Sequence, residues 1–466
     1  MKTYQDFLKA SDKLVFIIQA MDEYRASEMH SKAEEADAYY RGENPRLPKF
    51  FNQIELEGSR QSLNTGPKIP ITTGLFKRLV KLQVNSLWYY GAQVDKDANK
   101  TALGENFDYT ARNISKKACL HGVSYGFWNV NKLQHFTALE YFPLKNERDG
   151  ADMAGIRFWR LDETRPWIVQ LYEMDGWTEY TREGSKLTPA LDANGREIGK
   201  QAYKIATRED ALGVAVVSTG NYLDAEDKPL LPILPMYANE DHTSELTAPI
   251  RSKIDIKDAV LSTFGDEVMR AKILYWILEG FSGNVEDLLG IRAEMEKYGL
   301  IATNEATRID AKTVEVPFDN VRAFLQYLDA EIYKDFMAMN TDEITGGSLT
   351  NVAINTANHA ESMKVSDFEW ASADFVDRLF KLIGVTNAKV QFKRKTISND
   401  MEITQRIIML AGVGALDIQA MLELDPLILP EEVAIILARL LEEAALQVDD
   451  GVDDNPAGAV AEGASV

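Results

Sequence analysis

Two long amphipathic segments lie on either side of a short polar stretch in the second half of the chain. In the first, apolar side chains recur at spacings of three and four from 321 to 336, which is typical of a helix packed on one face. The second repeats this spacing from 357 to 382 and reaches Gly384, a common helix stop. The stretch 345–351 between them is polar and carries two glycines. The pattern predicts two helices joined by a short loop.

The preceding part of the chain alternates between helical and strand-like periodicity. Residues 1–40 and 71–91 have helical spacing, and 250–279 predicts a further helix. Between them, 122–217 contains short aromatic and β-branched runs separated by Asp-Gly and Asn-Gly turns, which indicates antiparallel hairpins. Three prolines in 229–235 exclude a helix and predict a stiff extended link. The order of these segments indicates an α+β fold.

The remaining segments are shorter. Residues 280–317 predict a small insert with strand-like pieces at 299–302 and 313–316, and the helices before and after it are expected to form a hairpin. Residues 390–396 predict one strand. The tail 448–466 is rich in Asp, Gly and Ala and is expected to be disordered. Ahead of the tail, three helices are predicted at 400–411, 417–423 and 431–446.

Charge narrows the range of functions. The chain has 466 residues, of which 51 are Lys or Arg and 72 are Asp or Glu, so its net charge is -21. Such an acid excess opposes general adhesion to nucleic acid or to anionic membranes. The longest apolar runs are broken by charges, so no membrane contact is predicted, and the protein is expected to stay in the cytoplasm where it is made. The single cysteine, Cys119, excludes an internal disulfide and is expected to be buried.

No catalytic or metal-binding pattern is present in the sequence. The five histidines lack the spacing of zinc ligands, and neither a G-x-S-x-G elbow nor a Walker-type phosphate loop occurs. Gly346-Gly347-Ser348 superficially resembles a phosphate cradle, but it lacks the lysine. The run Lys393-Arg394-Lys395 suits a contact with phosphate or a neighbouring subunit as well as it suits a solvated strand edge. The sequence therefore predicts a protein that is not an enzyme, with no cofactor and no identifiable metal ligands.

The order of the segments resembles a specific family, the portal or head-to-tail connector proteins of tailed bacteriophages, in the branch typical of long-tailed phages. The resemblance rests on the order of several sequence segments and not on one motif. Its members are Tyr39-Tyr40-Arg41-Gly42, the helix around Phe76–Val80, Trp88–Gly91, the β-rich block, the helices on either side of the insert, the glycine-bearing loop and Phe392–Asp400.

Membership implies a mainly helical portal fold assembled as a ring, usually of twelve subunits, at one capsid vertex. Double-stranded DNA would enter through this channel during packaging and leave during ejection. The implied partners are the terminase large subunit, a head-completion or adaptor protein, and the major capsid and scaffolding proteins. The implied regions are a wing (1–249 and 356–398), a stem (250–279 and 318–342), a clip (280–317), a tunnel loop (343–355), a crown (399–447) and an acidic tail (448–466).

The resemblance places Thr345, Gly346, Gly347, Ser348, Leu349, Thr350 and Asn351 against the DNA. No Lys or Arg occurs between Glu343 and Asn355, which suits contacts that form and break as a polyanion slides. Two alternatives stay open at this point. One is a cytoplasmic metal-dependent enzyme that processes nucleic acid, and the other is a structural ring or scaffold protein unconnected with DNA. On the portal hypothesis the protein ends in the virion, after assembly in the host cytoplasm.

Overall fold

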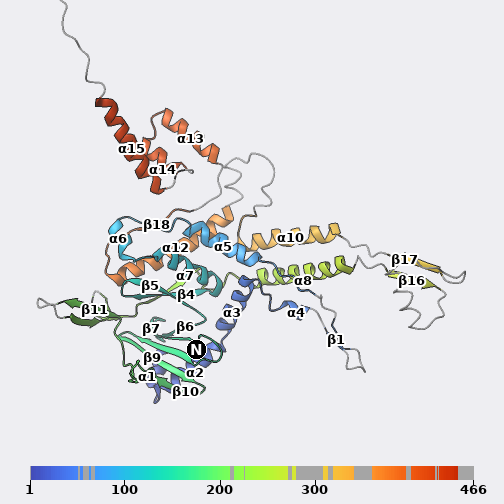
Figure 1. Ribbon diagram of the computed structural model, residues 1–466, viewed down its shortest axis with the longest axis horizontal. Coiled ribbons are helices and arrows are strands. Elements are labelled where there is room, and N and C mark those ends of the chain that lie inside the picture. Colours follow the sequence, from blue (N-terminus) through green and yellow to red (C-terminus); the bar gives the residue numbers. More distant parts are fainter. Residues whose placement is uncertain are drawn as a thin grey trace, which may run out of the picture. The chain divides into compact units, whose positions relative to one another are not determined.

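The computed structural model confirms the α+β class (Figure 1). It describes residues 2–50, 53–55, 62–64, 69–209, 215–224, 226–270, 275–279, 308–312, 318–340, 359–394, 400–425, 428 and 430–449. The chain divides into two compact units, the first formed by 1–340 with 360–395 and the second by 341–359 with 396–466. Each unit is described by itself below.

The N-terminal region forms three helices where one helix over 1–40 was predicted, so that prediction is wrong in its continuity. They are α1 (Tyr4–Lys9), α2 (Lys13–Arg25) and α3 (Glu28–Arg41). The breaks follow from local hydrogen bonding, because Asp12 and Ser27 cap the amides that start α2 and α3. Helix α3 ends at its C-cap, Gly42, which has a φ of 85° and lies close to the predicted helical limit at residue 40.

The predicted antiparallel hairpins are confirmed and form two main sheets. One has five strands in the order β10-β9-β8-β7-β6 and the other three in the order β15-β4-β5. The five-stranded sheet contains β6 (Tyr141–Lys145), β7 (Asp152–Trp159), β8 (Trp167–Glu173), β9 (Gly176–Glu183) and β10 (Lys186–Pro189). The three-stranded sheet contains β4 (Val123–Asn129), β5 (Lys132–Thr137) and β15 (Ile233–Tyr237).

The proline-rich stretch is more than the extended link that its composition predicted. Strand β15 lies at the edge of the three-stranded sheet, and Pro235 is opposite Tyr125 of β4. An edge position suits proline, which has no N–H to donate to a further strand. The smaller strand pairs are β3 (Ala92–Val94) with β18 (Val390–Phe392), β13 (Tyr222–Leu223) with β14 (Pro229–Leu230), β11 (Lys204–Glu209) with β12 (Ala215–Gly220), and β1 (Gln53–Glu55) with β2 (Ser62–Asn64).

A layer of helices covers the three-stranded sheet. Its members are α5 (Leu75–Trp88), α7 (Phe107–His121) and α12 (His359–Ile383), with α6 (Asp97–Ala102) at one end (Figure 1). Their apolar faces share one core with β4 and β5. Close approach of α12 to β4 depends on Gly126, because a Cβ built there would lie 2.6 Å from the Cζ atom of Phe375. On the far side of the molecule, α1 and α2 pack against the five-stranded sheet around a second core.

Helices α8 (Ala248–Arg270) and α10 (Phe318–Phe336) pack side by side and confirm the predicted helical hairpin. The prediction that the first helix reaches residue 279 is wrong, because 275–279 form β16 (Tyr275–Glu279), which pairs with β17 (Arg308–Lys312). The aromatic and β-branched side chains of Tyr275-Trp276-Ile277 favour a strand, and the partner strand satisfies its backbone groups. The predicted pieces at 299–302 and 313–316 lie outside the described residues. A short helix, α4 (Leu47–Phe50), precedes β1.

The second unit contains the three helices predicted near the C-terminus. They are α13 (Asp400–Gly412), α14 (Ile418–Leu424) and α15 (Pro430–Asp449). Asp417 caps α14 by accepting a hydrogen bond from the amide of Ala420. The predicted tail lies beyond the described residues apart from its first two positions. In the described parts of the chain, we find no helix that combines the length and apolar character needed to cross a bilayer.

Candidate functional site at the ends of α10 and α12

The predicted DNA-facing residues, Thr345 to Asn351, lie outside the residues that the structure describes. Its description stops at Asn340, just after α10, and resumes at His359, the first residue of α12. The candidate site is therefore built from the two helix ends that carry the segment 341–358. Their contacts decide where this segment leaves and rejoins the first unit.

Helix α10 ends in a tightly defined turn. The amide of Met337 donates to the carbonyl of Lys334 at 3.0 Å, and the amide of Ala338 donates to that of Tyr333 at 2.9 Å. This pair of bonds is the Schellman arrangement, and it places Met337 at a φ of 56°. A residue with a side chain is strained there, so the direction of the chain after α10 is set at a cost in conformational energy.

Glu361, in the first turn of α12, joins this turn to a third helix. Its Oε2 accepts a hydrogen bond from the amide of Met339 at 2.9 Å, and its Oε1 accepts one from the hydroxyl of Ser86 in α5 at 3.1 Å. One carboxylate thus links α10, α12 and α5. The described residues on either side of 341–358 are therefore joined by one side chain.

Lys364, one turn further along α12, makes a second link. Its Nζ lies 2.6 Å from Oε2 of Glu245 and donates to the carbonyl of Phe336 at 2.9 Å. It also lies 3.4 Å from the centroid of the Phe336 ring. The side chains of Lys364 and Glu245 are 15% and 8% exposed, so water screens their attraction little. This buried pair fixes α12 against the end of α10.

Glu245 is itself held in place from three directions. Gln83 of α5 and Asn239 each donate to its Oε1 at 3.3 Å, and its amide donates to the carbonyl of Cys119 at 2.9 Å. The prediction that Cys119 is buried is confirmed. Burial, together with the negative charge of Glu245, raises the pKa of the Cys119 thiol well above the usual value. Cys119 therefore stays a neutral apolar side chain, while the polar groups around it position Glu245.

The α8–α10 hairpin is held by ion pairs along its length. Lys253 of α8 lies 2.7 Å from Asp335 and 3.5 Å from Glu331 of α10, and Lys257 pairs with Asp329. These pairs fix the register of the two helices next to the end of α10.

Two buried carboxylates attach the other side of α8 to the N-terminal region. Asn44 donates to Asp255 at 3.0 Å and to Asp258 at 2.9 Å, and the hydroxyl of Tyr39 donates to Asp255. Burial raises the pKa of Asp258, and the nearby Asp255 adds to this shift. Burial and the hydrogen bond to Asp255 likewise raise the pKa of Tyr39, so its hydroxyl stays a donor.

The basic run 393–395 is partly engaged within its own chain. The guanidinium of Arg394 lies 2.6 Å from the carboxylate of Glu369 in α12 and donates to the carbonyl of Ser362 at 3.2 Å. The Nζ of Lys393 lies 5.5 Å from the ring centroid of Tyr90. Lys395 lies outside the described residues. A contact of this run with phosphate or a neighbouring subunit stays a prediction.

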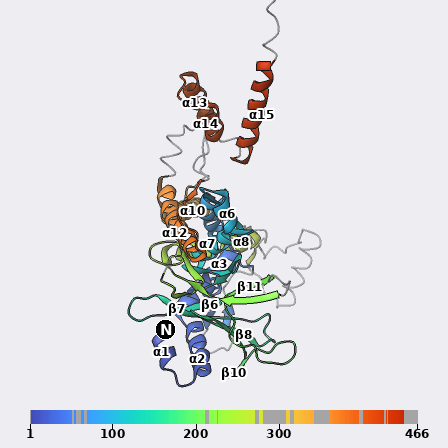
Figure 2. The same cartoon turned by 90° about the vertical axis from the view of Figure 1, so that its left-hand side faces the viewer.

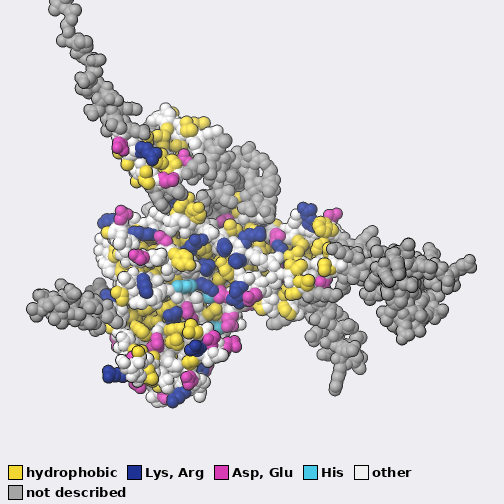
Figure 3. All heavy atoms as spheres, viewed as in Figure 1, with side chains coloured by type: hydrophobic (Ala, Val, Ile, Leu, Met, Phe, Trp, Pro, Cys, Tyr) yellow, Lys and Arg dark blue, Asp and Glu magenta, His cyan; other side chains and the backbone are white. Residues whose placement is uncertain are grey.

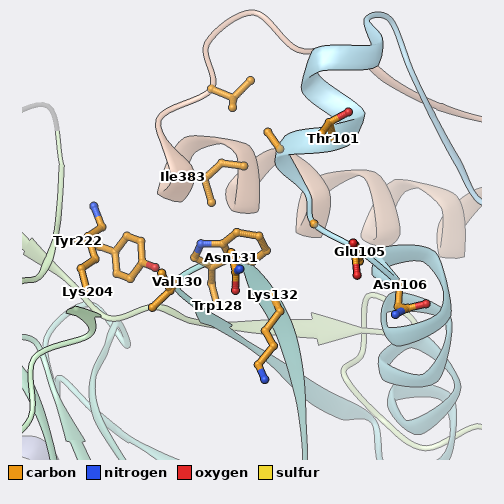
Figure 4. A pocket seen from close by; sticks show the side chains of 13 residues that line it. Thr101, Glu105, Asn106, Trp128, Val130, Asn131, Lys132, Lys204, Tyr222 and Ile383 are labelled. Atoms are coloured by element: carbon orange, nitrogen blue, oxygen red, sulfur yellow. The ribbon is translucent and has the colours of Figure 1, made fainter. Parts of the chain in front are cut away.

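A cavity of about 700 Å³ lies at the opposite end of α12, against Ile383 (Figure 4). Since 22 residues separate Ile383 from Glu361, it is roughly 33 Å along the helix from the candidate site. Trp128 and Tyr222 line it, and the Nζ of Lys204 lies 4.2 Å from the Tyr222 ring centroid. Within the described ranges, no group of three or more His, Cys, Asp or Glu side chains is arranged to hold a metal ion.

Comparison with known proteins decides the family. The model of the family "Phage portal protein, SPP1 Gp6-like" matches residues 23–445. The chain belongs to this family of phage portal proteins. The resemblance predicted from the order of its segments is confirmed, and it extends over nearly the whole chain.

Two portal proteins are among the relatives of this portal-family chain. It is 25% identical over 247 residues to the portal protein of Bacillus phage SPP1, a match that covers 48% of each chain. It is 28% identical over 213 residues to the portal protein of Clostridium phage phiCD119, which covers 43% of this chain and 46% of the relative. The chain thus spans about half the length of the relatives it matches.

Solved structures of gene transfer agent particles contain similar chains. One, from the virion of the native particle, is 12% identical with a TM-score of 0.42, and the match covers 82% of this chain and 89% of the other. Another, from the neck of the native particle computed with C12 symmetry, is 11% identical with a TM-score of 0.44, and the match covers 76% of this chain and 89% of the other.

Sequence reasoning about this portal-family chain missed the residues that hold the candidate loop. Glu361 and Lys364 are three residues apart, a spacing typical of an ordinary ion pair on a helix surface. Their actual partners, Met339 and Glu245, come from other segments. No periodic signal links these positions, because only the packing of α12 against α10 brings them together.

Proposed function

We propose that this protein is the portal subunit that forms a ring-shaped channel at a unique capsid vertex, through which double-stranded DNA enters during packaging and leaves during ejection. The observation that carries this proposal is the match of the portal family model to residues 23–445. About twelve subunits are expected in the ring. The protein acts in the virion after assembly in the host cytoplasm.

In this ring the segment 343–355 is the tunnel loop, and Thr345 to Asn351 face the DNA. The geometry of its two ends supports this role, because Glu361 and Lys364 fix α12 against α10 at both attachment points. A loop with rigid ends and no Lys or Arg can contact a moving polyanion without gripping it. The net charge of -21 likewise opposes tight binding of the DNA.

The other regions take the roles that the family resemblance implies. Residues 250–279 and 318–342, which include α8 and α10, form the stem, and 280–317, which includes β17, is the clip that binds the terminase large subunit and later a head-completion protein. The sheets with α5, α7 and α12 form the wing, and α13 to α15 form the crown. The protein has no catalytic role, and ATP hydrolysis belongs to the terminase. Major capsid and scaffolding proteins surround the ring.

Electron microscopy of the purified protein tests assembly. We expect rings of about twelve subunits with a central channel, and a monodisperse monomer at high concentration would refute the proposal. A nuclease assay with added Mg²⁺ or Mn²⁺ tests the enzymatic alternative, and metal-dependent cleavage by the purified ring would favour it.

A paired substitution tests the role of the loop in DNA passage. Gly346→Pro with Gly347→Pro restricts the backbone at the two positions with the widest conformational freedom. We expect rings to assemble and capsids to stay largely empty. The matched control is Gly458→Pro with Gly463→Pro in the acidic tail, which should leave packaging unchanged. Normal DNA filling by the loop variant would contradict the proposed contact and favour a structural ring unconnected with DNA.

A further inference from the structure

Helices α5 and α7 together carry a concentration of positive charge that is unusual in so acidic a protein. They hold six Lys or Arg residues against a single acid, Asp108, which is already paired with Lys100 at 2.7 Å. We call the outward-facing part the cationic surface, and it consists of Lys77 and Lys81 on α5 and Tyr109, Arg112 and Lys116 on α7. Figure 3 shows Lys and Arg side chains gathered over these two helices.

The two rows of the cationic surface lie side by side. Arg112 donates a hydrogen bond to Asn85, which aligns α7 with α5. Burial lowers the pKa of Lys116, and the positive charges of Lys117, Arg112 and Lys81 lower it further. Crowded like charges of this kind are relieved when an anionic surface binds.

The chain supplies little counter-charge to this surface. The acid that acts on Lys116 is Asp37, and it is bound by Lys117 at 2.7 Å. Among the residues that the structure describes, Lys81 has no acidic partner. Tyr109 is 72% exposed beside these cations. Tyrosine and arginine, such as Tyr109 and Arg112, are enriched in protein interfaces.

Helix α12 carries the opposite charge on its outward face. Spacings of four, three, four and three place five residues in one row, which we call the acidic stripe: Met363, Asp367, Trp370, Asp374 and Asp377. Trp370 is 78% exposed and Met363 is 47% exposed. Asp374 pairs with Arg378 at 2.8 Å. Tryptophan is enriched among the interface residues that contribute most to binding energy.

The two surfaces belong to different helices, and both sets of helices pack their apolar faces on the same core. In Figure 2, α12 lies along the left side of the helical layer, and α3 and α8 lie on its right. The right of that view is the side that faces the viewer in Figure 3. One subunit thus presents complementary charges on separate helices.

We propose that the cationic surface of one copy binds the acidic stripe of a second copy. Such a head-to-tail contact uses different patches on the two partners, and its repetition gives a ring when the rotation between neighbours closes. Lys77, Lys81, Arg112 and Lys116 would face Asp367, Asp374 and Asp377, while Trp370 supplies the apolar anchor. This inference rests on the ring proposed above and assigns one of its subunit contacts.

DNA is the other polyanion that the cationic surface suits. The observations favour a second copy, because DNA binding would leave the exposed Trp370 and the acidic stripe without a partner. Charge complementarity within one chain accounts for both surfaces together.

Reversing each surface separately tests this contact. The first variant carries Lys77→Glu and Lys81→Glu, and the second carries Asp367→Lys and Asp377→Lys. In the first variant two glutamates face the acids of the stripe beside the remaining Arg112 and Lys116, and in the second two lysines face the cationic surface beside the remaining Asp374. Both variants lose the charge attraction of the contact, so we expect the subunit concentration for half-assembly to rise by about tenfold or more. Sedimentation velocity at low and high salt gives the measurement. The matched control is Lys132→Glu with Lys186→Glu, two exposed lysines elsewhere on the first unit, which should assemble as wild type does.

An equimolar mixture of the two charge-reversed variants is the decisive arm. In the mixture the new glutamates of one variant meet the new lysines of the other, so assembly should return towards the wild-type concentration dependence. Restoration also shows that both variants are folded. Failure of the mixture to assemble any better than its separate components would overturn the contact.

The remaining outcomes separate this contact from the ring itself. If wild type assembles and both variants assemble equally well, the contact is wrong and the ring stands. If the lysine variant assembles normally but loses binding to a duplex DNA fragment, the cationic surface serves DNA and the proposed contact is wrong. If wild type stays monomeric, the ring and this contact fail together.

Discussion

Replacing Lys364 by methionine should destabilise the first unit strongly. Methionine keeps much of the apolar stem of lysine but leaves the carboxylate of Glu245, only 8% exposed, without its cation at 2.6 Å. Removal of one partner of a buried ion pair costs about 3–5 kcal/mol of unfolding free energy, because the remaining charge is desolvated and unpaired. The carbonyl of Phe336 also loses its donor.

The companion variant separates the cost of the unpaired charge from the value of the pair. Adding Glu245→Gln to Lys364→Met removes the buried charge and keeps an amide that can bond to Gln83 or Asn239. We expect the double variant to regain about 2 kcal/mol or more over Lys364→Met alone. The control is Lys228→Met, whose partner Glu226 is 72% exposed, and its effect should stay below about 1 kcal/mol.

Urea unfolding followed by tryptophan fluorescence measures these differences. All seven tryptophans belong to the first unit, so the signal reports on the unit that contains the ion pair. Wild type and variants are compared at one subunit concentration, because assembly would otherwise shift the apparent stability. The reasoning would be refuted if Lys364→Met cost no more than Lys228→Met, or if the double variant were less stable than Lys364→Met.

Three further predictions use the same assay. Glu361→Ala removes the acceptor of an amide just after α10 and should lower the unfolding free energy by about 1–3 kcal/mol; no change would mean that this carboxylate does not hold the helix end. Gly126→Ala should cost about 1–3 kcal/mol because its Cβ would meet Phe375 at 2.6 Å, whereas Gly199→Ala, with open space around it, should stay within about 0.5 kcal/mol. Burial, with nearby positive charges, lowers the pKa of His135 to about 3. Its contribution to the free energy of unfolding is therefore complete above about pH 6.5, the pKa of histidine in the unfolded chain, and is lost as the pH falls below that. Between pH 7 and pH 5 this loss is about 2 kcal/mol, and His135→Gln should lose correspondingly less over that interval; equal pH dependence of the two proteins would contradict the assignment.

The local pattern of apolar, polar and turn residues was sufficient to predict most of the secondary structure. The amphipathic rows of α10 and α12, the turns at Asp149-Gly150 and Asp175-Gly176, and the three C-terminal helices depend on contacts within a few residues. The prediction failed where a distant partner decided the conformation. Residues 275–279 are a strand because 308–312 pair with them, and the stretch around Pro235 is a strand because β4 lies beside it.

The sequence by itself determined the order of the elements, the absence of a recognisable catalytic motif and, through that order, the family. Only the tertiary structure decided what holds the candidate loop. Glu361, Lys364 and Glu245 lie on segments more than a hundred residues apart at the extremes, and burial is what turns their ordinary charges into a specific link. The cationic surface likewise exists only because α5 and α7 lie side by side. The sequence gives the charge at each position. Packing decides which charges lie close together and how far water is excluded from them, and these two factors set their interaction energy.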